Sequence, residues 1–447
     1  MLRIYKKLKP LYKRAFAHKG FKRYLKNTNW LLGGQIFRLG IGLFVSVAIA
    51  RYMGPEDFGL YNYILSIITL VGVFGQLGLG ELAKRELVES PERRDEIMGT
   101  CFVLNLLAGG VIYVVMLALV AVQTDRTIVL GLFALLGSSL LLAPLRCIEL
   151  WFQAQVRSDL SVVATSLTLG IFAVFKLLAI VQGAGLIVFG YIFLLEGTTL
   201  CILQVFFYHK YFGSIFKWQL RWSTASAFLQ QSWPLILTGL SITVFLRIDQ
   251  IMLGAMLGEA AVGQYSVAVR ISTIWYFIPG ILTISLFPAI VNSRNHGGDG
   301  YETRLQAYFD LSASLAYLVA ITLSIIAPWI IQMLFGLEYQ EAGAILAIHA
   351  WGTLFAFLGT AREAYLMAEK MFKFSMYCTL VGAFLNIILN YLMIPSYGGC
   401  GSAVASVVSL SVSGYISSVL IIHRNAMLKG YLKSIFVPLK WLNFIVK

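Results

Sequence analysis

The chain of 447 residues is 59% hydrophobic and only 13% charged, and its net charge is +14. A soluble domain is about half apolar and about one quarter charged, so this sequence lacks the charge needed to cover a water-facing surface. Composition excludes a disordered chain, a disulfide-stapled secreted scaffold and an ordinary cytosolic enzyme. What remains is a polytopic membrane protein.

Apolar runs recur along the whole chain at the length that a membrane helix needs. A bilayer span takes about 20 mostly apolar residues, and we predict twelve helical spans, six in each half. Those of the first half cover residues 28–50, 60–80, 100–122, 128–148, 161–181 and 186–208. Those of the second half cover residues 232–256, 263–287, 309–335, 342–366, 375–394 and 402–422. The predicted fold class is therefore all-α, with no room for a separate catalytic domain.

Basic residues gather in alternate loops. Residues 1–26 hold ten Lys and Arg, and the loops on the same side, with the C-terminal tail, raise the total to 27 of 35. Only Arg51 and Arg126 lie in the opposite loops. Because Lys and Arg concentrate on the cytoplasmic side of membrane proteins, we expect both termini in the cytoplasm. These residues flank apolar spans, which argues against a nucleic-acid partner.

The N-terminal segment is basic and amphipathic. Apolar residues recur at helical spacing from Met1 to Phe16, which predicts a helix lying in the cytoplasmic interface against anionic membrane lipids. Further on, Ala48 and Ala50 resemble a signal-peptidase site. The apolar run before them is about 20 residues, too long for a signal peptide, so we expect the first span to be permanent.

Three residues after the first span match three after the seventh at a constant offset of 204 positions. They are Gly54, Gly59 and Tyr61, matched by Gly258, Gly263 and Tyr265. Parallel repeats of this kind are a transporter architecture, with the site between the halves near mid-membrane. We therefore predict a basic segment at 1–27, an N-terminal lobe at 28–222, a C-terminal lobe at 223–424 and a basic tail at 425–447.

Ionisable side chains inside spans are costly and usually mark a pathway. The deep ones are Arg38, Lys176, Glu196, Arg247, Asp249 and Arg270. A second group lies near span ends, where long side chains are expected to reach the lipid–water boundary. It consists of Arg146, Glu149, Asp310, Arg362 and Glu363.

The deep cations lie on polar stripes, which should face protein or a water-filled cavity. The stripes are Gln35 with Arg38, Thr243 with Arg247 and Gln250, and Ser266 with Arg270 and Thr273. Surplus positive charge suits an anionic substrate, and arginine grips phosphate through two parallel hydrogen bonds. The residues predicted to bind substrate are therefore Arg38, Arg247, Arg270, Lys176, Gln35 and Gln250. Arg38 and Arg247, on equivalent spans, are expected to face each other across the cleft between the halves.

Ion coupling has three candidates, Glu196, Asp249 and Asp310. An internal ion pair of Lys176 with Glu196 remains open as an alternative. Asn386 and Asn390 are four residues apart and are expected to join helices. His349, the only histidine in a span, is either structural or a proton relay.

No motif indicates a metal, a cofactor or an enzyme. The five cysteines form no CxxC pair, and neither a P-loop nor a hydrolase motif occurs. Transport would then be driven by an ion gradient, the membrane potential or the substrate gradient.

Several segments resemble bacterial polysaccharide-unit flippases of the Wzx type, in the MATE-like (multidrug/oligosaccharidyl-lipid/polysaccharide) exporter superfamily. They are residues 29–36 (NWLLGGQI), 50–61 (ARYMGPEDFGLY), 76–80 (QLGLG), 84–85 (KR), 247–254 (RIDQIMLG), 263–265 (GQY), 395–398 (PSYG) and 401–403 (GSA). The resemblance implies two six-helix lobes around a central cavity that opens alternately to each side. Its implied cargo is an undecaprenyl-diphosphate-linked oligosaccharide, such as an O-antigen or exopolysaccharide repeat unit. It also implies a bacterial cytoplasmic membrane and, as partners, a polysaccharide polymerase and a chain-length regulator.

The sequence leaves three other functions as alternatives. A MATE-type drug or metabolite antiporter predicts acidic cavity residues, which the cationic surplus disfavours. A lipid II flippase typically has two further spans. A membrane glycosyltransferase or polymerase needs a sizeable catalytic loop, whereas the outer loops here look shorter than about ten residues.

Overall fold

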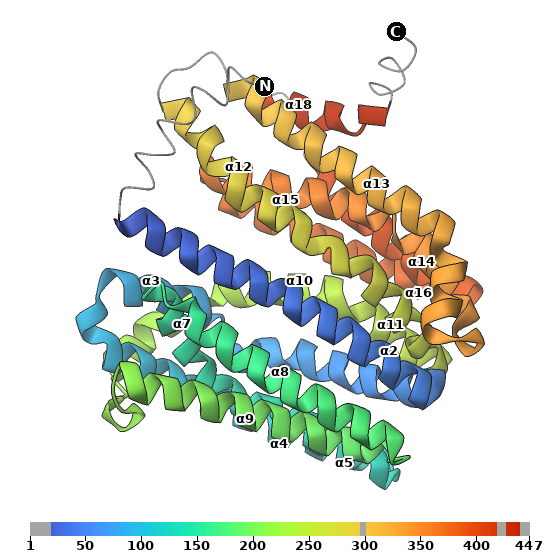
Figure 1. Ribbon diagram of the computed structural model, residues 1–447, viewed down its shortest axis with the longest axis horizontal. Helices are drawn as coiled ribbons and strands as arrows, with labels where there is room; N and C mark the ends of the chain where they lie inside the picture. Colours follow the sequence, from blue (N-terminus) through green and yellow to red (C-terminus); the bar gives the residue numbers. More distant parts are fainter. Residues whose placement is uncertain (1–18, 296–300, 418–425, 439–447) are drawn as a thin grey trace. The chain divides into compact units, whose positions relative to one another are not determined.

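The computed structural model describes residues 19–295, 301–417 and 426–438. Every regular element in these ranges is a helix (Figure 1), which confirms the predicted all-α class. The amphipathic face predicted for residues 1–16 lies outside the described ranges.

Nine helices of the described residues are long and apolar enough to cross a membrane, and one bent pair brings the number to ten. That pair joins Leu337–His349 to Gly352–Ala368 at an angle of 44°. Two of the nine are themselves broken, α2 (Lys19–Gln76) at Gly54 and α16 (Phe372–Ser411) at Gly398. The chain is a multi-pass membrane protein, and these numbers are consistent with the twelve predicted spans.

Both glycine turns of the repeat are present. Gly54 has φ 71° and is followed by Pro55 within α2. Gly258 has φ 91° and directly precedes α11 (Glu259–Thr273). Glycine adopts such positive φ values without steric cost, and the fixed φ of proline suits the first turn of the helix that follows. Matching positions of the two halves therefore redirect the chain by the same means.

The two glycine hairpins pack on each other reciprocally. A Cβ atom on Gly59 would overlap the carbonyl group of Glu259, and one on Gly263 would overlap the carbonyl group of Pro55. Pro55 and Glu259 are themselves equivalent positions of the repeat. Each half thus supplies a glycine that admits the backbone of the other, which is the pattern of a twofold-related contact.

The chain forms two compact units. Unit 1 comprises residues 1–49 and 71–236, and unit 2 comprises residues 50–70 and 237–447. Two helices, α2 and α10 (Trp222–Leu257), contribute to both units. The lobe boundaries proposed from the sequence, including the division at residue 222, stay a prediction.

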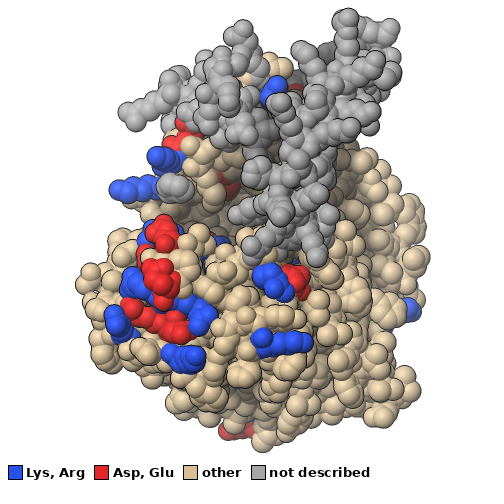
Figure 2. All heavy atoms as spheres, turned by 60° about the vertical axis from the view of Figure 1, so that its left-hand side comes forward, with Lys and Arg blue, Asp and Glu red and all other residues tan. Residues whose placement is uncertain are grey.

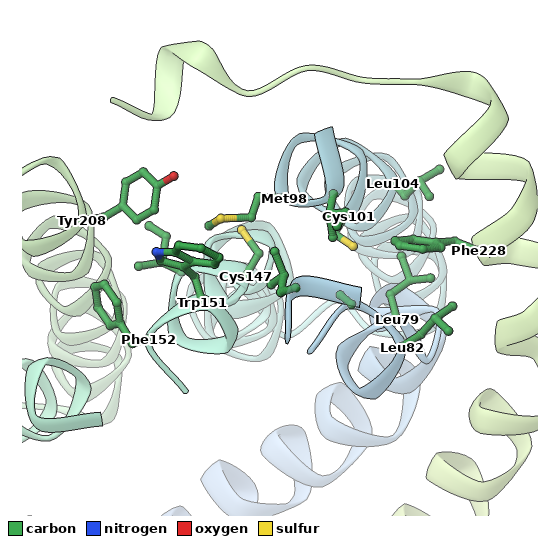
Figure 3. Packing of buried hydrophobic residues seen from close by; sticks show 14 of the residues in the cluster. Leu79, Leu82, Met98, Cys101, Leu104, Cys147, Trp151, Phe152, Tyr208 and Phe228 are labelled. Atoms are coloured by element: carbon green, nitrogen blue, oxygen red, sulfur yellow. The ribbon is translucent and has the colours of Figure 1, made fainter. Parts of the chain in front are cut away.

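Unit 1 is built mainly from α3 to α9, with α8 and α9 side by side (Figure 1). The elements are α3 (Leu79–Glu89), η1 (Pro91–Arg93), α4 (Arg94–Gln123), α5 (Thr127–Gly137), α6 (Ser139–Leu142), η2 (Ala143–Arg146), α7 (Cys147–Ala154), α8 (Ser158–Val181), α9 (Leu186–Tyr211) and η3 (Ile215–Lys217). In its core, Leu79 of α3 and Cys101 of α4 pack with Cys147 and Trp151 of α7 (Figure 3). These two cysteines are packing groups.

Charged side chains of unit 1 form ion pairs around α3 and the beginning of α4. Lys84 pairs with Glu81 at 2.7 Å, and Arg93 pairs with Glu96 at 2.6 Å. In Figure 2, Lys, Arg, Asp and Glu gather in one region, and most of the remaining visible face carries no charge. This distribution is expected where a few surface regions meet water and the rest meets lipid.

Unit 2 contains the remaining described helices. Besides α11 and α16 they are η4 (Ile274–Tyr276), α12 (Phe277–Asn295), α13 (Tyr301–Phe335), η5 (Leu337–Tyr339), α14 (Gln340–His349), α15 (Gly352–Ala368), the π-helical turn η6 (Val412–Ile416) and α18 (Ala426–Ser434). Tyr431 of α18 packs edge-on against Phe309 of α13, at 5.2 Å between ring centres. Its hydroxyl donates to the Gly414 carbonyl in η6 at 2.6 Å.

The π-helical turn also explains one wrong expectation. Arg362 was expected to reach the lipid–water boundary, but it is only 2% exposed. Its Nη1 donates to the Ser413 carbonyl at 2.7 Å. That carbonyl is available because the backbone N–H of Ser417 donates to Val412, one residue earlier than in an α-helix. A wide turn, which hydropathy does not reveal, thus provides the acceptor that a buried guanidinium needs.

Candidate functional site

The polar centre of unit 2 is the carboxylate of Asp249, on α10, which is 4% exposed. The Tyr265 hydroxyl of α11 donates to Oδ2 at 2.5 Å, and Asn390 Nδ2 of α16 donates to Oδ1 at 2.6 Å. The Ser406 hydroxyl, also on α16, donates to Oδ2. Among the described residues, no basic side chain forms an ion pair with Asp249. We call Asp249, Tyr265, Asn386, Asn390, Ser402 and Ser406 the Asp249 cluster.

Two amides of α16 behave differently within this cluster. Ser402 donates to Asn390 Oδ1 at 2.6 Å, so the Asn390 nitrogen is directed at Asp249. Asn386 is fully buried, and its oxygen accepts no hydrogen bond from the residues that the structure describes, while its nitrogen lies close enough to Asp249 to act on that carboxylate. An unpaired buried polar group costs about 1–3 kcal/mol, and such a group often marks a place for a water or an ion. The expectation that these amides join helices is confirmed for Asn390 only.

His349 lies beside the cluster. Its Nδ1 atom is 2.8 Å from the Ser272 hydroxyl oxygen, and its ring stands edge-on to Tyr265 at 6.1 Å. The Tyr265 hydroxyl, however, is already directed at Asp249. His349, at the end of α14, therefore packs against the Tyr265 ring and helps to hold it in place.

Gln250, the next residue of α10, holds a second buried polar junction of unit 2. Its Oε1 accepts from the Ser66 hydroxyl of α2 and, at 3.4 Å, from Arg247 Nη1. Its Nε2 donates to the Ser266 hydroxyl of α11 at 3.1 Å. Gln250 thereby joins α10 to α11 and to the 50–70 part of α2, and it is the hydrogen-bond partner of Arg247.

Arg247 and Arg270 are two membrane-embedded cations of unit 2 that lie within electrostatic range of each other. Arg247 is half-buried, whereas the Arg270 side chain is exposed. No Asp or Glu of the described ranges acts on either guanidinium, although the Tyr61 side chain lies close enough to act on Arg270. Two like charges without a counter-ion are unfavourable inside a membrane protein, so this arrangement calls for water or an anion beside them.

The predicted site residues of unit 1 form local pairs. Arg38 donates to Gln35 on α2, and its side chain is exposed. Lys176 Nζ of α8 lies 2.6 Å from Glu196 Oε2 of α9, which is the internal ion pair that the sequence left open.

Asp310, the third candidate for ion coupling, lies on α13 of unit 2. There its Oδ1 accepts from Gln306 Nε2, one helical turn earlier, at 2.8 Å. Asp249 is therefore the candidate whose carboxylate is enclosed by side chains from several helices.

Sequence reasoning missed four members of these junctions, namely Ser66, Tyr265, Ser402 and Ser406. A signal for some of them was present. Ser402 and Ser406 are four residues apart, as are Asn386 and Asn390, so each pair lies on one face of its helix. Two such pairs on consecutive spans mark polar faces that can meet.

Residues 24–294 match the sequence profile of a family described as "Polysaccharide biosynthesis protein", and residues 234–392 match the MatE family. Since the first match covers more than half of the chain, the chain belongs to this polysaccharide biosynthesis protein family.

A curated relative is "Probable low-salt glycan biosynthesis flippase Agl15" of Haloferax volcanii. It is 24% identical over 199 residues, which are 43% of this chain and 39% of the relative. The match thus spans about two fifths of that relative's length.

Two solved structures share the fold. An inward-facing MATE-family multidrug resistance transporter has a TM-score of 0.73 at 14% identity, covering 88% of this chain and 95% of that one. The lipid II flippase MurJ, in an inward closed conformation, has a TM-score of 0.68 at 16% identity, covering 94% and 93%. These likenesses confirm the MATE-like fold that the sequence predicted.

Proposed function

We propose that this protein is a flippase that moves undecaprenyl-diphosphate-linked oligosaccharide repeat units across the bacterial cytoplasmic membrane by alternating access. The observation that carries the proposal is the pair Arg247 and Arg270. The two guanidinium groups are close enough to repel each other, and no Asp or Glu of the described residues acts on either of them. A diphosphate is a compact anion that planar guanidinium groups bind through parallel hydrogen bonds. Arg38, supported by Gln35, is proposed as a third cation for the same anion.

The other predicted residues take graded roles in this proposal. Lys176 reaches an anion only when its ion pair with Glu196 opens, so we place it on the path rather than at the site.

The glycan-flippase name of the relative supports a glycan cargo. O-antigen and exopolysaccharide units are the proposed cargoes, and a polymerase and a chain-length regulator are the proposed partners. The basic loops support cytoplasmic termini.

We propose the Asp249 cluster as the place where a monovalent cation couples to transport. The groups around the carboxylate are hydroxyls, which either donate or accept, and amides, which present an oxygen when they turn. The donors that now stabilise a bare carboxylate can therefore become oxygen ligands, which hard cations prefer. Asn386, whose amide oxygen accepts no hydrogen bond among the described residues, supplies one more such oxygen. Glu196 and Asp310 are weaker candidates, because the Glu196 carboxylate is already paired with Lys176 and the Asp310 carboxylate already accepts a hydrogen bond from Gln306.

The test is complementation of a deletion strain. We expect Arg38→Ala, Arg247→Ala and Arg270→Ala each to abolish surface polysaccharide while the protein still inserts, and lipid-linked repeat units to accumulate on the cytoplasmic leaflet. Lys217→Ala, which removes an exposed cation from η3, is the matched control and should complement fully. If Arg38→Ala and Arg247→Ala also complement fully, the cationic site is refuted. Normal polysaccharide with lost drug resistance would indicate a small-molecule exporter instead.

A further inference from the structure

Two adjacent residues of α10 each form a side-chain hydrogen bond to α11, and we call each of these hydrogen bonds a rung. Asp249 bonds to Tyr265, and Gln250 bonds to Ser266. Because successive residues of a helix point about 100° apart, the two rungs continue to different neighbours. The Asp249 rung continues to Asn390 and Ser406 of α16, whereas the Gln250 rung continues to Ser66 of α2.

Gln250 is also the hydrogen-bond partner of Arg247. Its single oxygen accepts from both Ser66 and Arg247, and its nitrogen donates to Ser266. With three partners from three segments, the amide has a fixed orientation, and its oxygen can face Arg247 only while the Ser266 rung holds its nitrogen. The position of the Arg247 guanidinium therefore depends on the register of α10 against α11.

A cation at Asp249 acts on that same register. A hydroxyl that donates to the bare carboxylate has to turn its lone pairs toward the cation instead. The Asp249–Tyr265 rung then changes, and the Gln250–Ser266 rung is only one residue away on both helices.

We propose that Gln250 is a positioning residue that orients Arg247 and makes its affinity for a diphosphate lipid depend on cation occupancy at Asp249. The inference rests on the proposed function, since it presupposes that Arg247 holds the diphosphate. Gln250 itself then touches Arg247 and not the cargo. Replacing Gln250 should therefore change the effect of the cation on the affinity for the diphosphate lipid more than it changes that affinity.

The experiment measures binding of undecaprenyl diphosphate to the full-length protein in nanodiscs, with sodium or with choline as the only monovalent cation and at two pH values. The wild type is expected to bind with a dissociation constant that differs about tenfold between occupied and empty Asp249, the factor that 1.4 kcal/mol represents. Gln250→Leu should bind with little cation dependence, and Asp249→Asn should behave alike. Arg247→Ala should lose affinity in every condition.

Two further variants separate positioning from folding. Ser266→Ala removes only the rung to Gln250 and should also flatten the cation dependence, even if Gln250→Leu fails to fold. Ser241→Ala is the matched control, because this buried serine of α10 bonds only to its own helix at Leu237, and it should keep the wild-type ratio.

The outcomes distinguish the inference from the function on which it rests. Wild-type cation dependence in both Gln250→Leu and Ser266→Ala overturns the positioning role while leaving the flippase proposal intact. Unchanged affinity in Arg247→Ala overturns the arginine site and the inference together. A wild type that ignores both sodium and pH overturns the coupling while sparing the cargo.

Discussion

Each unit holds a carboxylate inside its membrane helices, and the two are stabilised in different ways. In unit 1, Glu196 is neutralised by Lys176 at 2.6 Å. In unit 2, Asp249 receives hydrogen bonds from hydroxyl and amide groups, and no described basic residue pairs with it. In an ion pair the charge of the carboxylate is balanced by the charge of its partner. Hydrogen bonds from neutral groups stabilise a carboxylate without balancing its negative charge. This difference is the reason why we propose Asp249, rather than Glu196, as the carboxylate that binds a cation.

The largest effect is expected at Asp249. Asp249→Asn keeps the size of the side chain but removes its charge, so we expect a protein that inserts and yet gives no surface polysaccharide. The measurement is complementation together with the amount of protein in the membrane, with Ser241→Ala as the control. Normal polysaccharide from Asp249→Asn would show that the unpaired carboxylate of unit 2 has no part in transport.

An intermediate effect is expected at the ion pair of unit 1. Lys176→Met leaves Glu196 without its partner and should lower the free energy of unfolding by about 1–3 kcal/mol, the cost of an unsatisfied buried polar group. The double variant Lys176→Met/Glu196→Leu removes both charges and should recover most of that stability. Thermal unfolding in detergent measures both. If the double variant is stable but inactive, Lys176 contacts the cargo, as the sequence suggested, and the contrast between the units weakens.

The smallest effect is expected at Tyr265. Tyr265→Phe removes one of the donors to Asp249, and a hydrogen bond to a charged group is worth about 1.5–3 kcal/mol. The same hydroxyl is proposed to turn its oxygen toward the cation, so its loss should lower the apparent affinity for the cation, by about tenfold. Titration of cation-dependent transport is the measurement. A higher affinity would mean that the Tyr265 hydroxyl stabilises only the cation-free carboxylate and is not a ligand of the cation.

Composition and the repeat predicted the architecture well. Hydropathy alone indicates spans, and the turns at Gly54 and Gly258 follow from glycine's freedom at positive φ. The assignment of charges to roles was less complete. Asp249 was named as a candidate, but its partners Tyr265 and Ser406 were not, since nothing in a single sequence says which polar faces of distant spans meet.

The errors and gaps have a common physical origin. Arg362 was misplaced because its acceptor, the Ser413 carbonyl, becomes available only through a π-helical turn. The partners of Gln250, namely Ser66, Ser266 and Arg247, were not predicted, and its assignment to substrate stays a prediction. Both depend on which backbone and side-chain groups remain free after packing, and hydrophobic periodicity carries no information on that.

The reciprocal glycine contact has a consequence for how the two hairpins depend on each other. Gly59 admits the backbone at Glu259, and Gly263 admits the backbone at Pro55, which is the self-complementary geometry of a symmetric dimer interface. One hairpin sequence, present in two separate subunits, would make this same contact twice. A single polypeptide thus contains both copies of a contact in which each hairpin needs only one glycine, so a larger residue at either Gly59 or Gly263 would separate both hairpins at once.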